Sequence, residues 1–179
     1  LTRGVEVRDV FLESLTSRSD FQDVMPLVRD KLGENSEVFL NLLKSTLNQS
    51  ALINNTENVQ FILDKLAGEN SKEVLSGSLA LHCSLYHYDK DLTDYLLDKV
   101  GAEDVRTLLT EHRDVNFHQG ALLGTPISIA AHQGNWNFIK KIHDNYDIGY
   151  EELSCTNTDS VHESILHIAA NKKEYRFIK

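Results

Sequence analysis

The sequence is poor in the residues that interrupt regular secondary structure. Its 179 residues include only two prolines and nine glycines, too few for a β-sandwich with many tight turns. It also has no run of 18 apolar residues, so we expect no membrane insertion. These absences favour a mostly helical globular protein.

Cysteine is equally scarce. Cys83 and Cys155 are far apart and neither belongs to a CxxC pair, so a disulfide framework is not expected. Few cysteines fit a reducing compartment, which predicts a cytoplasmic or other intracellular location. Delivery into a host cell is the alternative if the chain belongs to a bacterial effector.

The sequence also lacks the patterns that carry common chemistry. Cys155, His162 and His167 do not match the spacing of a structural zinc site, and no cysteine-hydrolase signature surrounds Cys155. The glycine-rich motifs that hold phosphates are absent. We therefore expect no enzyme activity, no catalytic residue, no metal and no cofactor.

Basic residues are outnumbered by acidic ones. Lysine and arginine total 18 against 27 aspartates and glutamates, for a formal net charge of −9. Binding to nucleic acid phosphates relies on Lys and Arg, so no nucleic acid partner is expected. The first residue is not Met and the opening residues form no signal peptide, so we expect a fragment of a longer protein.

What the sequence does contain is a repeat. Similar segments end in Asp-Lys and an aliphatic residue, with aspartates at Asp30, Asp64 and Asp98. The interval is 34 residues twice, which lies in the range of helical repeats. One helix pair cannot bury its apolar stripe alone, whereas stacked pairs can.

The pattern within the interval predicts two helices. Leu81 and Leu85 lie on one face of a short helix, and a polar turn begins at Asp89. Leu92 and Leu96 then mark the apolar face of a second helix. A later segment has stronger helix signals, in which Thr125 and Pro126 open a helix and Gly134 ends it.

These later residues carry a family resemblance. Residues 124–139 read GTPISIAAHQGNWNFI and residues 164–170 read SILHIAA, which resembles the ankyrin repeat. Looser matches occur at 81–85 and 47–51. The equivalent residues are Leu47, Leu81, Ile127 and Leu166, separated by 34, 46 and 39 residues. The longer intervals predict inserted residues, either in loops or in lengthened second helices.

The resemblance implies an all-α protein, an ankyrin-like α-solenoid of stacked helix-turn-helix repeats. We divide the chain into residues 1–42, either an N-terminal helical cap or a degenerate repeat, and four repeats near 43–76, 77–121, 122–160 and 161–179, the last one incomplete. Residues 114–116, Asp-Val-Asn, resemble a loop of the family.

The resemblance also implies a function, a protein–protein interaction module within a larger intracellular protein. The alternative is a regulatory or targeting segment of a larger multidomain enzyme, toxin or bacterial effector. The partner would be another protein, bound by the fingers and first helices of the repeats. The positions implied for binding are Cys83, Tyr86, His87, His118, Gln119, Leu122, Ile129, His132, Gln133, His162, Glu163, Ile168, Asn171 and Lys172.

Overall fold

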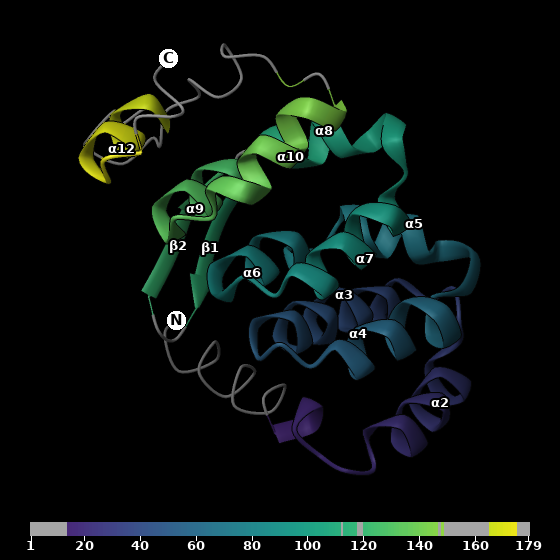
Figure 1. Cartoon of the computed structure of the whole chain (residues 1–179). Coiled ribbons are helices and arrows are strands. Elements are labelled where there is room, and N and C mark those ends of the chain that lie inside the picture. Colours follow the sequence, from purple (N-terminus) through teal and green to yellow (C-terminus); the bar gives the residue numbers. More distant parts are fainter. Residues whose placement is uncertain (1–13, 112, 118–119, 147, 149–164, 175–179) are drawn as a thin grey trace.

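The computed structural model describes residues 14–111, 113–117, 120–146, 148 and 165–174, with the backbone alone for 113–117 and 120–123. Helices account for most of this part of the chain, together with a short two-stranded hairpin. The predicted all-α class is confirmed. Figure 1 shows the helices stacked in order from α2 at one end to α12 at the other.

A row of inner helices runs through the stack. Its members are α3 (Glu37–Leu52), α6 (Ala80–His87), α9 (Pro126–Gln133) and α12 (Ile165–Asn171). Each packs directly against the next, α3 on α6, α6 on α9 and α9 on α12. Inner helices from distant parts of the sequence therefore share one core (Figure 1).

Outer helices return along the inner ones. They are α4 (Thr56–Phe61), which continues as the π-helical turn η1 (Ile62–Leu66), then α7 (Lys90–Val100) and α10 (Trp136–Tyr146). Each packs on the inner helix that precedes it. At the N-terminal end, α2 (Phe21–Leu32) contacts α3, α4 and η1.

A third helix, which the sequence patterns did not predict, follows the outer helix in the first units. The turn η2 (Gly68–Asn70) leads into α5 (Ser71–Ser76), and α8 (Ala102–Thr110) follows α7. A shift of 34 residues moves α4 and η1 (residues 56–66) onto the bounds of α7. The same shift moves η2 and α5 (residues 68–76) onto the bounds of α8. The 34-residue period is therefore a period of three helices, not of a helix pair.

The same period explains the long helix α3. Subtracting 34 from the bounds of α5 gives 37–42, the first part of α3, and subtracting 34 from those of α6 gives 46–53, which covers the last part of α3 and the residue after it. A third helix and an inner helix are thus fused into one. The same shift moves α4 and η1 (residues 56–66) onto residues 22–32, which lie within α2, so α2 occupies the place of an outer helix.

A β-hairpin lies where the interval lengthens from 34 to 46 residues. Strands β1 (Arg113–Phe117) and β2 (Gly120–Gly124) are antiparallel, with Val115 opposite Leu122. Three residues join α5 to α6, whereas fifteen join α8 to α9, and the difference of twelve accounts for the longer interval. Residues 114–116, predicted as a loop, form part of β1 because their backbone pairs with β2.

The helix signals read from the sequence act as predicted around α9. The Thr125 hydroxyl accepts a hydrogen bond from the Ser128 amide at 3.1 Å, and Pro126 occupies the first turn. Gly134 ends the helix with φ +80, a left-handed conformation that suits glycine. Among the described residues, no helix is long and apolar enough to cross a membrane.

Candidate protein-binding surface

The four inner helices end in the same way. A residue with positive φ follows each of them, namely Asn54, Tyr88, Gly134 and Lys173. We call these four residues the corners. They are separated by 34, 46 and 39 residues, and each lies seven residues after the corresponding Leu47, Leu81, Ile127 or Leu166. The structure therefore agrees with the register derived from the sequence.

One backbone hydrogen bond repeats at the first, third and fourth corners. The amide of the residue after the corner donates at 2.8 Å to the carbonyl four residues before the corner, as in Asn55 to Ser50, Asn135 to Ala130 and Glu174 to Ala169. This is the longer bond of the Schellman motif. The chain thus leaves α3, α9 and α12 along the same path, and the side chains before these three corners reach equivalent places.

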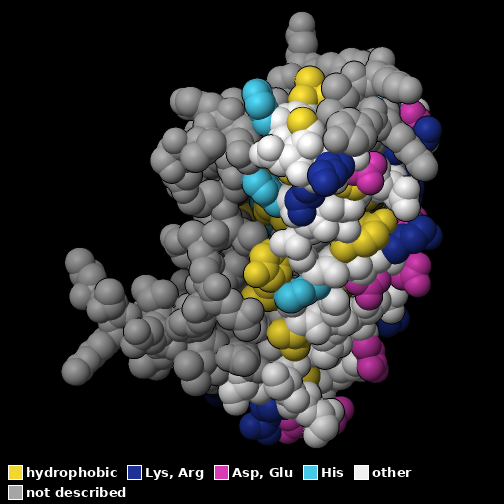
Figure 2. All heavy atoms as spheres, turned by 60° about the vertical axis from the view of Figure 1, so that its left-hand side comes forward, with side chains coloured by type: hydrophobic (Ala, Val, Ile, Leu, Met, Phe, Trp, Pro, Cys, Tyr) yellow, Lys and Arg dark blue, Asp and Glu magenta, His cyan; other side chains and the backbone are white. Residues whose placement is uncertain are grey.

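We define the corner edge as residues 52–54, 86–88, 132–134 and 171–173. All of them are exposed or half-buried. Tyr86 packs edge-on against the His87 ring, with centroids 4.7 Å apart, and Tyr88 packs on Phe138 of the next unit at 6.2 Å. On the face shown in Figure 2, histidine side chains form a column beside hydrophobic side chains, and most acidic side chains lie to the right of this column.

Six of the residues that the resemblance implied for binding lie on the corner edge. Tyr86 is half-buried, and the other five are exposed. These five are His87, His132, Gln133, Asn171 and Lys172.

Three other predicted binding residues belong to the core. Cys83, Ile129 and Ile168 occupy one position of the repeat, and at most 3% of each residue is exposed. Their side chains lie where neighbouring inner helices pack, so they do not reach a partner, and we remove them from the candidate surface. Burial also raises the pKa of the Cys83 thiol, so it stays protonated and is a poor nucleophile.

The remaining predicted residues are not placed by the structure. His118, Gln119, His162 and Glu163 lie outside the described residues. Leu122 lies in β2 opposite Val115, and only its backbone is described.

The sequence reasoning missed the first corner. Leu52 and Ile53 precede Asn54 as Tyr86 and His87 precede Tyr88, and Ile53 is 42% exposed. An exposed isoleucine aligned with predicted binding positions belongs to the same surface. Subtracting the 34-residue period from Tyr86 and His87 would have found both residues.

The outer helices carry ion pairs between successive units. The Asp64 carboxylate on η1 accepts a hydrogen bond from the Tyr95 hydroxyl at 3.0 Å and pairs with Lys99 at 2.5 Å, both from α7. The hydrogen bond from Lys99 lowers the pKa of Asp64. Lys141 of α10 reaches back to Asp94 of α7 at 2.6 Å. These charged groups on the outer helices thus join neighbouring units to each other.

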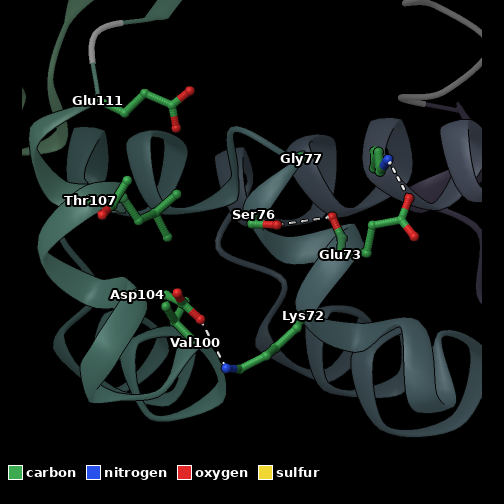
Figure 3. Close-up of a pocket in the computed structure, with 10 residues that line it drawn as sticks. Lys72, Glu73, Ser76, Gly77, Val100, Asp104, Thr107 and Glu111 are labelled. Carbon is green, nitrogen blue, oxygen red and sulfur yellow. Dashed lines mark hydrogen bonds and ion pairs between the residues drawn. The ribbon is translucent and has the colours of Figure 1, made fainter.

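A shallow groove of about 420 Å³ lies between the third helices α5 and α8. Its base includes the buried Val100 and Leu108. The Lys72–Asp104 pair at 2.9 Å connects its two sides, as Figure 3 shows. The Lys44–Glu73 pair at 3.1 Å lies on the α5 side. Because four of the five charged residues that line it pair with one another, the groove is a weaker binding candidate than the corner edge.

The described residues contain no group of three His, Cys, Asp or Glu side chains placed to hold a metal ion. Of Cys155, His162 and His167, which the sequence did not support as a zinc or catalytic site, only His167 is described, and it is exposed on α12.

Comparison with known proteins adds no family. No protein-family model matches the sequence, and no curated protein or solved structure shows a significant similarity to it. A functional assignment therefore depends on the geometry described above.

Proposed function

We propose that this chain is a repeat-solenoid module that binds another protein through the corner edge. The supporting observation is that four stacked inner helices present exposed side chains at one repeated position. Stacked repeats create extended surfaces of this kind, on which the exposed side chains determine which partner is bound.

The unit around α9 and α10 is the one most similar to an ankyrin repeat. A hairpin precedes a helix that begins at Thr125-Pro126 and ends at Gly134, as the family pattern implies. The two preceding units have a third helix and are joined by three residues, without a hairpin. We interpret the array as a divergent solenoid, ankyrin-like in its later part, and residues 20–42 as its degenerate first repeat.

The hydrogen bonding and packing of the corner edge also favour binding over a purely structural role. Structural side chains in this protein have clear partners, such as the Tyr95 hydroxyl on Asp64. His132 and Gln133 are instead exposed on a helix end whose backbone is already capped by Gly134 and Asn135. Exposed polar and aromatic side chains beside half-buried hydrophobic ones are typical of a mixed interface.

The test compares partner capture by matched variants in cells. His87→Ala with His132→Ala changes the corner edge, and Lys140→Ala with Asp144→Ala changes exposed residues of α10 on the outer row. Surface substitutions of this kind change stability by about 0.5 kcal/mol or less, so both variants should have nearly the same melting temperature as the wild type. Proximity labelling followed by affinity measurement identifies the partners.

We expect a protein captured by the wild type and by the α10 variant to be lost by the corner-edge variant, with at least tenfold weaker affinity. Equal capture by all three proteins would mean that the edge is not the binding surface. The absence of any partner enriched over an unrelated helical protein would contradict the function itself.

A further inference from the structure

The backbone contributes little net charge at the first three corners, where an outer helix follows in the described part of the chain. The C-terminal end of an inner helix and the N-terminal end of an outer helix meet there, for example α6 and α7 at Tyr88. The two helix ends carry opposite partial charges of similar size, so they largely cancel. At these three corners the side chains therefore decide which charge a partner needs.

These side chains differ in charge from the rest of the chain. The chain carries a formal net charge of −9, yet none of the residues of the corner edge is acidic. Lys172 and Lys173 are exposed at the fourth corner. This end of the edge favours carboxylates.

The opposite end of the corner edge is apolar. Ile53 is among the most exposed large hydrophobic residues described, and Leu52 lies half-buried beside it. At the second corner, Tyr86 and Tyr88 are half-buried and pack against the core. The edge thus changes from apolar at the first two corners to basic at the fourth.

The length of the edge limits the form of its ligand. Packed helices lie about 10 Å apart, so four corners span about 30 Å. An extended chain rises about 3.3 Å per residue, so about nine residues in extended conformation reach from the first corner to the fourth. A helical segment of the same length would need about twenty residues.

From this charge pattern and length, we propose that the corner edge binds an extended peptide segment of another protein, with aliphatic or aromatic residues at one end and aspartates or glutamates at the other. The apolar end lies on Leu52, Ile53 and Tyr86, and the acidic end lies on Lys172 and Lys173. This inference depends on the proposed function and adds to it the chemical class and orientation of the ligand.

The test uses a phage-displayed library of random twelve-residue peptides, selected against the immobilised chain. Lys172→Glu with Lys173→Glu reverses the charge of the fourth corner. Lys65→Glu with Lys140→Glu makes the same change in charge at exposed positions of the outer helices. Ile53→Ser removes the apolar anchor. Thermal melting checks that each variant is folded, and Lys172→Ala with Lys173→Ala replaces the first variant if it is not.

Peptides selected by the wild type should carry net negative charge, with carboxylates grouped at one end and hydrophobic residues at the other. Synthetic copies should bind at least tenfold more weakly to the Lys172→Glu, Lys173→Glu variant and several-fold more weakly to Ile53→Ser. The control variant should bind as the wild type does, and added salt should weaken binding by screening the charges.

Selection of neutral or basic peptides, or equal binding to the edge and control variants, would overturn the proposal. A selection that yields no peptide above the blank support would overturn the linear ligand. The proposed function would then stand or fall on the separate capture of a folded partner by the wild type and the His87, His132 variant.

Discussion

Replacing Ser50 by alanine should stabilise the protein. Ser50 lies on the inner helix α3 and is fully buried, and among the described residues its hydroxyl oxygen has no hydrogen-bond partner. A buried polar group without a partner costs roughly 1–3 kcal/mol, and alanine is the better helix former by about 0.5 kcal/mol. Two later units support the exchange, because Ala130 on α9 and Ala169 on α12 occupy the same position of the repeat.

Allowing for the small void that the oxygen leaves, we expect Ser50→Ala to raise the free energy of unfolding by about 1–2 kcal/mol. For a chain of this size, this corresponds to an increase in melting temperature of about 3–6 °C. Urea denaturation gives the free energy, and calorimetry gives the melting temperature. An unchanged slope against urea would show that the two proteins expose the same surface on unfolding and differ only in stability.

Ser84 provides a matched control at the same position of the next unit. Its hydroxyl donates to the Leu81 carbonyl at 3.0 Å and lies 3.3 Å from the Thr93 hydroxyl of α7. Ser84→Ala should therefore destabilise the protein by about 1 kcal/mol, since satisfied hydrogen bonds are lost. The reasoning is refuted if the two substitutions shift stability in the same direction, or if Ser50→Ala is destabilising.

Three further predictions concern the outer helices, the corners and the hairpin. The hydrogen bond from Lys99 lowers the pKa of Asp64, so the ionised carboxylate stabilises the fold above its unfolded pKa of about 3.8 and loses this contribution as the pH falls. Between pH 7 and pH 2.5, the melting temperature should therefore fall more steeply for the wild type than for Asp64→Asn. Parallel curves would argue against a stabilising role of the Asp64 carboxylate. Gly134→Ala should cost about 1 kcal/mol in urea denaturation because its φ is +80, and a neutral result would contradict a left-handed corner. Deleting residues 113–124 restores the 34-residue interval and should leave cooperative unfolding and the helical circular dichroism intact, whereas loss of cooperativity would show that the hairpin is part of the core unit.

Local signals in the sequence predicted the later helices well. The capping hydroxyl of Thr125, the proline after it and Gly134 act over a few residues, so their effect does not depend on distant packing. Asp89 caps α7 in the same local way, accepting from the Leu92 amide at 3.0 Å. The interval between repeats was also readable, because equivalent helices bury equivalent residues.

Other features depend on tertiary contacts. The ankyrin-like pattern implies two helices per repeat and so did not predict a third, although α8 has an apolar face of its own, formed by Val105, Leu108 and Leu109. Cys83 and Ile129 were expected on the surface because the pattern does not restrict them. Their burial follows from packing between neighbouring inner helices, which no single unit of the sequence reveals.

The fused helix α3 has a mechanical consequence. Its first part completes the unit that contains α2, and its last part begins the unit that contains α4. Two neighbouring units thus share one continuous helix, whereas α5 and α6 are separate helices joined by a short linker. Under a pulling force applied at the ends of the chain, we expect the first two units to rupture in a single event, so the array transmits tension there as one block.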